Sequence, residues 1–172
     1  MLPIAVLLVL AQPRAESSTE ATIERGHREC ADIVVTSPQQ TKRRVGMPFS
    51  ATRILDLQFS SRMRRRLAGE HVLQFKVYTP RGHLYQPLTV PFTSLGRRKG
   101  DRWVDGFPRP LPEQAQRPVD DGGVRRYEVS ATLPVGGTAI MSNSLYGRWR
   151  VEAFLDSDLH PCGTAARFDI QP

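Results

Sequence analysis

The feature that most constrains the fold is a two-residue alternation of apolar and polar side chains that recurs along the chain. It is clearest in residues 71–78, where Leu73, Phe75 and Val77 alternate with polar residues. Because successive side chains of a strand point to opposite faces of a sheet, this pattern predicts strands with one buried face. The alternation, or a short β-branched run, marks seven segments: residues 31–36, 53–59, 71–78, 84–93, 127–133, 149–155 and 167–171.

Seven short strands separated by turn-forming residues predict an all-β fold, an antiparallel β-sandwich in which two sheets enclose one core. A small closed barrel is the alternative. Only residues 60–69 and 138–145 could hold a helical turn. Pro87 and Pro91 cannot donate backbone hydrogen bonds, so we expect residues 84–93 to form an edge strand or a bulged strand.

One segment, residues 94–123, interrupts this order with a long run rich in proline, glycine and basic residues. Loops of this length without their own secondary structure are uncommon in compact domains, and they tend to be functional or disordered. Trp103 and Phe107 favour a loop that docks somewhere, because apolar rings in a mobile loop usually find a packing surface. A mobile insertion is the alternative.

The N-terminus predicts the compartment. Residues 2–11 form an apolar run that is long enough for a secretory signal peptide and too short to span a bilayer. We therefore expect a signal peptide over residues 1–15, a polar tail over residues 16–30 and one β-sandwich domain over residues 31–172. The protein is then periplasmic or secreted, with no transmembrane segment in the mature chain. Because no basic residue precedes the run, a start further upstream or a buried strand is the alternative.

The chain has two cysteines, Cys30 and Cys162, which lie close to the two ends of the expected domain. An even number of cysteines in an exported protein favours a disulfide, here one that closes nearly the whole domain into a loop. Two unrelated thiols are the alternative. The spacing of a zinc site is not present around either cysteine, so we expect no metal.

Residues 145–156, with Gly147, Trp149, Val151, Leu155 and Asp156, follow a pattern close to G-x-W-x-V-x-x-x-L-D. This stretch resembles the late hairpin of bacterial extracytoplasmic immunoglobulin-like β-sandwich domains, mainly over residues 145–171. The resemblance implies that Trp149 fills the core between the sheets and that Asp156 starts a turn. It carries no catalytic residues. The chain departs from the pattern through an insertion at residues 158–162.

The alternation and the hairpin pattern together give the expected core, which comprises Phe75, Trp149, Val151 and Phe168. Signatures of catalysis are not found: the sequence has no G-x-S-x-G elbow, no H-E-x-x-H motif and no phosphate-binding glycine loop. We therefore expect no catalytic residues, no cofactor and no enzymatic activity. Carboxylate pairs such as Asp156 with Asp158 are read as turn formers rather than as a calcium site.

Basic residues exceed acidic ones by 24 to 17, a net charge of +7, and they gather between the predicted strands. Arginine forks match carboxylates and phosphates, so clustered arginines favour an anionic partner. We expect the contact residues to be Arg62, Arg64, Arg65 and Arg66, between two strands, and Arg97, Arg98 and Lys99, at the start of the long loop. Residues 42–44 form a third cluster. The alternative is that these residues are solvated and prevent strands from pairing edge to edge.

Together these features predict a non-enzymatic binding or structural module of a bacterial envelope. Its partner would be an envelope protein or an anionic surface, either lipid phosphate or acidic polysaccharide. Nucleic acid is disfavoured, because export removes the usual ligand and no recognised binding motif accompanies the charge. A secreted enzyme accessory or hydrolase with an unrecognised site, or a protein that binds an anionic polymer, is the alternative.

Overall fold

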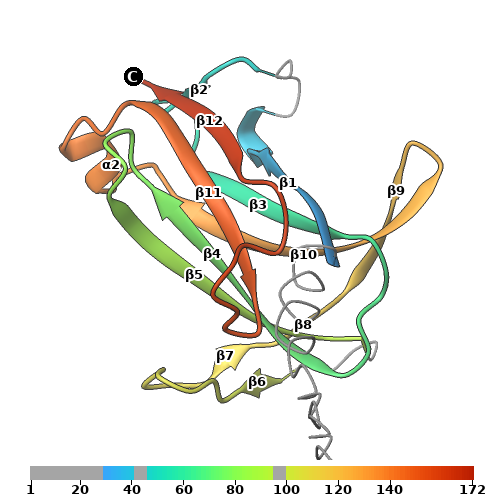
Figure 1. The fold of residues 1–172 in the computed structure, drawn as a ribbon. Coiled ribbons are helices and arrows are strands. Elements are labelled where there is room, and N and C mark those ends of the chain that lie inside the picture. The colour runs from blue at the N-terminus through green and yellow to red at the C-terminus, as the bar shows by residue number, and fades with distance from the viewer. Residues whose placement is uncertain (1–28, 41–45, 95–99) are drawn as a thin grey trace, which may run out of the picture.

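The computed structural model describes residues 29–40, 46–94 and 100–172, and they form antiparallel and mixed β-sheets (Figure 1). Seven strands longer than five residues lie where the alternation predicts them, and shorter strands extend the sheets. The predicted signal peptide and most of the predicted polar tail lie outside the described residues. Within those residues, no helix is long and apolar enough to cross a membrane.

The first sheet has four strands, and every neighbouring pair is antiparallel. In spatial order they are β1 (Cys30–Thr36), β3 (Asp56–Met63), β10 (Val124–Pro134) and β9 (Arg117–Asp121).

The second sheet has six strands and is mixed, because its two shortest members, β2 and β8, pair in parallel with their neighbours. In spatial order they are β2 (Phe49–Ser50), β12 (Ala166–Gln171), β11 (Gly147–Leu155), β4 (Glu70–Tyr78), β5 (Leu84–Thr93) and β8 (Gln114–Ala115). The expectation of a purely antiparallel fold is therefore wrong at these two edges, where a few backbone hydrogen bonds suffice for parallel pairing.

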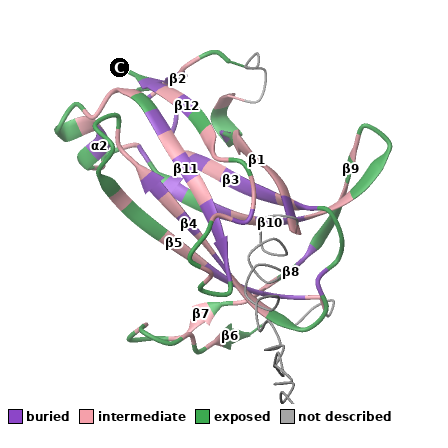
Figure 2. Ribbon diagram, viewed as in Figure 1, coloured by how far each residue is buried: buried purple, intermediate pink, exposed green. Residues whose placement is uncertain are grey.

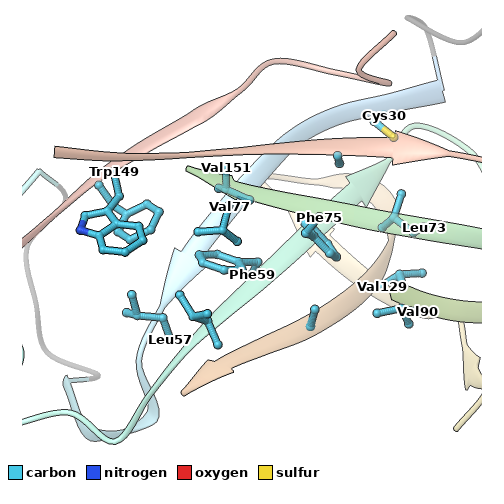
Figure 3. Close-up of a cluster of buried hydrophobic side chains, with 14 of the residues drawn as sticks. Cys30, Leu57, Phe59, Leu73, Phe75, Val77, Val90, Val129, Trp149 and Val151 are labelled. Atoms are coloured by element: carbon cyan, nitrogen blue, oxygen red, sulfur yellow. The ribbon is translucent and has the colours of Figure 1, made fainter. Parts of the chain in front are cut away.

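One core lies between the two larger sheets. The ring of Phe59 in β3 lies 6.2 Å from that of Phe75 in β4 and 5.5 Å from that of Phe168 in β12, so side chains of both sheets meet. Trp149 and Val151 are fully buried in the same cluster. Figure 2 shows the buried positions along the central strands of both sheets, and Figure 3 shows their side chains converging.

Strand β3 differs from its predicted bounds at both ends. It starts at Asp56 because the carbonyl of Leu55 accepts hydrogen bonds from the backbone of Val135 and Gly136, and this leaves the Leu55 side chain 64% exposed. It continues to Met63 because residues 60–63 pair with β1 on one side and β10 on the other. A helical turn over residues 60–69 is therefore wrong.

The described part of the segment over residues 94–123 contains regular secondary structure. It contains β8 and β9 and a separate pair of short strands, β6 (Asp101–Arg102) and β7 (Leu111–Pro112). A tight turn joins β9 to β10, with Gly122 and Gly123 at positive φ and the backbone N–H of Gly123 donating to the Asp120 carboxylate. Glycine adopts this conformation without steric cost, so the turn lets β9 fold back along β10.

Among the described residues, short helical elements occur in two further connections. A 3-10 turn, η1 (Pro38–Gln40), follows β1, and a helical turn, α2 (Ala139–Ser142), lies within the predicted residues 138–145. The hydroxyl of Thr138 accepts a hydrogen bond from the backbone N–H of Ile140 and so caps the first turn of α2.

A disulfide joins Cys30 and Cys162, whose Cα atoms lie 5.2 Å apart. The backbone N–H of Cys30 donates to the carbonyl of Cys162, and the N–H of Cys162 donates to the carbonyl of Ala153 in β11. The insertion at residues 158–162 thus serves a purpose that the sequence pattern alone did not reveal. It carries Cys162 back along β11 to the first residue of β1.

Candidate functional site

The described part of the predicted arginine cluster lies at the end of β3 and in the connection that leads to β4. Arg62 belongs to β3, whereas Arg64, Arg65 and Arg66 follow it and are exposed. The cluster is therefore divided between a sheet and a loop, and its members have different surroundings.

Arg62 is bound within the fold. Its Nη1 lies 2.7 Å from Oδ1 of Asp121 in β9, and 24% of its side chain is exposed. The Nε of Arg126 lies 3.9 Å from the other oxygen of the same carboxylate. Arg62 thus ties β9 to β3 across β10. The expectation that it contacts a partner is not favoured by this geometry, because its charge is already matched.

We expect Arg62→Met to lower the free energy of unfolding by about 1 kcal/mol, because it removes a half-buried ion pair and leaves Asp121 with only its longer contact to Arg126. The matched variant Arg66→Met, at an exposed position, should change it by less than about 0.5 kcal/mol. Urea unfolding followed by circular dichroism measures both values. Equal effects of the two variants would contradict the structural role of Arg62.

Arg65 is exposed but paired. Its guanidinium donates through Nε and Nη2 to both carboxylate oxygens of Glu29, and the Nε bond measures 2.9 Å. These hydrogen bonds and the nearby negative charge raise the pKa of Arg65 further above its ordinary value. The backbone N–H of Arg64 also donates to the carbonyl of Glu29, at 2.9 Å. Glu29, which precedes Cys30, therefore fixes the start of the β3–β4 connection through hydrogen bonds to Arg64 and Arg65.

Arg64 and Arg66 are the two arginines of this cluster that remain available. Both are exposed, and neither has an ion pair with any residue in the described ranges. Two guanidinium groups separated by one residue on a surface connection present donors that fit carboxylate or phosphate oxygens.

The connection is fixed by contacts on its far side. Leu67 is buried, its backbone N–H donates to Oε1 of Gln116 at 3.1 Å, and its carbonyl accepts from Nε2 of the same side chain at 2.9 Å. The side-chain amide of Gln116 thus makes the two backbone hydrogen bonds that a neighbouring strand would otherwise make to Leu67. The connection is therefore anchored immediately after Arg66, so the two free arginines project from a defined backbone.

His71 anchors the next part of the connection. Its Nδ1 lies 2.6 Å from Oδ2 of Asp156 and its Nε2 lies 2.9 Å from the carbonyl oxygen of Ala68. The ring also stacks on Phe92, with 5.4 Å between centroids. The ring therefore links the connection at Ala68 to Asp156, the residue that follows β11.

The second predicted cluster, Arg97, Arg98 and Lys99, lies outside the described residues, as do residues 42–44. The chain enters the segment 95–99 from Ser94, whose N–H donates to the carbonyl of Gly69 and whose hydroxyl accepts from the N–H of Gly69. The end of β5 is therefore joined to the same connection that carries Arg64 and Arg66.

Sequence reasoning did not identify the residues that pair with these arginines or anchor their connection. Glu29, Asp121 and Gln116 lie 36, 59 and 49 residues from the groups they bind, and nothing local in the sequence relates them. A partial local signal did exist for Arg62: Leu57, Phe59 and Met63 have the spacing of one strand face, although Ser61 interrupts the apolar alternation between them.

The rest of the described surface offers no metal centre, since no three His, Cys, Asp or Glu side chains in these ranges gather closely enough. Other charged groups pair locally, as Arg117 does with Glu128. Burial and the carboxylate of Glu152 raise the pKa of the Tyr78 phenol above its ordinary value.

At the β3–β4 connection, the two unpaired guanidinium groups of Arg64 and Arg66 offer positive charge and hydrogen-bond donors that suit the binding of an anion.

In comparisons with known proteins, no family model matches this chain and no curated protein is significantly similar to it.

Proposed function

We propose that the protein is an exported, non-enzymatic binding module of a bacterial envelope that contacts an anionic partner through the β3–β4 connection. One observation carries this proposal: Arg64 and Arg66 are exposed and unpaired among the described residues, on a connection anchored by Leu67 and Gln116. An anchored loop loses little conformational entropy on binding, which favours affinity.

The strand order supports an immunoglobulin-like sandwich as the scaffold. In such domains strands A, B, E and D form one sheet, and strands G, F, C and C′ form the other. The order β1-β3-β10-β9 fits the first set, and the order β12-β11-β4-β5 fits the second. The cysteines depart from antibody domains, because here the disulfide joins the start of β1 to the connection before β12.

Export is supported by the disulfide, because such bonds form and persist in oxidising compartments. The apolar run at residues 2–11 agrees with it. Outside the cytoplasm, the anions that two guanidinium groups fit are lipid phosphates, the carboxylates of acidic polysaccharides and acidic segments of envelope proteins.

The test compares the double variant Arg64→Gln/Arg66→Gln with Arg81→Gln/Arg109→Gln, which removes the same charge from exposed positions outside the β3–β4 connection. The probes are vesicles containing phosphatidylglycerol, soluble polygalacturonate and immobilised envelope extract. We expect the first variant to bind one probe about 10- to 30-fold more weakly than wild type. The control should retain wild-type binding.

The three probes separate the three sources of negative charge, and thermal unfolding of each variant checks that it remains folded. A steep fall of binding with salt on both polymer and vesicle would indicate non-specific attraction to polyanions. Equal losses in the two double variants would contradict the proposal, because the effect would then follow total charge rather than this connection.

A further inference from the structure

β1 and β12 run beside each other on one side of the molecule, away from the β3–β4 connection (Figure 1). A groove of about 660 Å³ lies between them. Residues 33–36 of β1 form one wall and residues 166–169 of β12 form the other. Residues of the 3-10 turn η1, with Gly46 and Met47, also line it. The groove therefore separates one edge of the first sheet from one edge of the second.

Among the described residues, no strand pairs with the sides of β1 and β12 that face the groove, apart from the last residues of β12. β1 pairs only with β3, and β12 pairs with β2 only at Ile170 and Gln171. The carbonyl of Gln171 accepts from Ala51 on the β2 side. Backbone N–H and C=O groups alternate in direction along a strand. The backbone groups of Arg167 and Asp169 therefore point to the same side of β12 as those of Gln171, which is the β2 side. The described residues provide no strand to pair with them.

The floor of the groove is apolar. Val35 from β1 and Ala166 from β12 are partly buried against the core, and Phe168, which belongs to the core, is almost fully buried. An open edge beside an apolar floor is the arrangement that takes up an added strand: backbone hydrogen bonds hold it, and every second side chain packs inward.

The unmatched charge along the described part of this edge is the positive charge of Arg167. Arg167 is exposed and has no ion pair with any described residue, and in the ladder it lies directly opposite Arg150. The carboxylate of Asp169 is engaged by Arg148, with 3.5 Å between Nε and Oδ1. An occupant with a carboxylate beside Arg167 would match this edge, whereas a basic occupant would be repelled.

We propose that this groove binds an extended, acidic segment of another polypeptide, which adds as a strand to β12. About four residues of the segment pair with the uncovered part of β12, a length of about 13 Å. Apolar side chains at alternate positions face Val35 and Ala166, and a carboxylate lies beside Arg167. This site is distinct from the β3–β4 connection and does not depend on the function proposed for it.

The test uses fluorescein-labelled eight-residue peptides of alternating Glu and Val, alternating Lys and Val, and the Glu–Val sequence with alternate amides N-methylated. Fluorescence anisotropy with the full chain measures their binding. We expect the Glu–Val peptide to bind at least tenfold more tightly than the N-methylated peptide, because methylation removes the strand hydrogen bonds. Hydrogen exchange should slow at residues 166–169 when it binds.

Two variants locate the binding. Ala166→Trp fills the groove and should abolish binding, whereas Leu84→Trp, on an exposed residue of β5, should not. Arg167→Glu should weaken the Glu–Val peptide about two- to fivefold and strengthen the Lys–Val peptide by a similar factor. The charge reversal lies at an exposed position, so it tests the proposal even if Ala166→Trp fails to fold.

Three results would overturn the proposal: no binding of the Glu–Val peptide, binding that Ala166→Trp leaves unchanged in the folded protein, or equal binding of the N-methylated peptide. Sedimentation of the wild-type chain supplies a further criterion. Self-association that Ala166→Trp abolishes would identify a second copy of this chain as the occupant and would also overturn the proposal.

Discussion

Removal of the disulfide in the double variant Cys30→Ala/Cys162→Ala is expected to lower the free energy of unfolding by about 4–5 kcal/mol. The two cysteines are 132 residues apart in sequence, so the bond closes most of the described chain into a loop. On the chain-entropy model, a cross-link of this span restricts the unfolded ensemble strongly while costing the native state little. Alanine is chosen because both positions are buried and a serine hydroxyl there would add a second cost.

Guanidinium chloride unfolding measures this effect. The variant should unfold at a lower midpoint and with a steeper dependence on denaturant, because its unfolded chain is no longer cross-linked and exposes more surface. Wild-type protein unfolded in the presence of a reductant serves as the control and should behave like the variant. A loss below about 1 kcal/mol would show that the unfolded chain is already held compact without the bond.

The alternation located the long strands well because burial of one face imposes it. In β4, Leu73, Phe75 and Val77 are all fully buried, and the strand extends only one residue beyond the predicted segment. The requirement that one face be apolar leaves a signal in every such strand, whatever its partners. The sequence therefore predicted which segments are strands better than it predicted where each strand ends.

The short strands left no such signal. β2 and β8 have two residues each and are held by backbone hydrogen bonds to β12 and β5, which any side chains permit. The groove depends on the shortness of β2, which pairs with β12 only at Ile170 and Gln171 and leaves residues 166–169 unpaired on that side among the described residues. A strand edge that stays open is a property of the assembled sheet, and no local pattern encodes it.

The arginine cluster shows the same limit at the level of single residues. Arg62, Arg65 and Arg66 look equivalent in the sequence, yet Arg62 pairs with Asp121, Arg65 pairs with Glu29, and Arg66 has no ion pair with any described residue. Whether a charge is matched depends on contacts between distant segments, which the topology decides. Sequence reasoning could identify the cluster as basic but could not divide it into structural and available residues.

Trp149→Ala is expected to lower the free energy of unfolding by about 3–5 kcal/mol, because it leaves a large cavity between the sheets. The indole is fully buried, with ring centroids 5.3 Å from Tyr85 and 6.3 Å from Phe168. Its Nε1–H donates to the carbonyl of Leu145 at 2.9 Å, so the variant also leaves that carbonyl without its donor. The loss should appear as a lower midpoint of denaturant unfolding.

The chain supplies a matched control, because its other tryptophan, Trp103, is 70% exposed. Trp103→Ala should change the free energy of unfolding by less than about 0.5 kcal/mol. Trp149→Phe separates packing from hydrogen bonding: it keeps an aromatic ring and removes the donor, so its loss should lie between those of the two alanine variants. If Trp149→Ala cost no more than Trp103→Ala, the indole would not occupy the core between the two sheets, and the pairing of β11 with β12, which sets it against Phe168, would have to be revised.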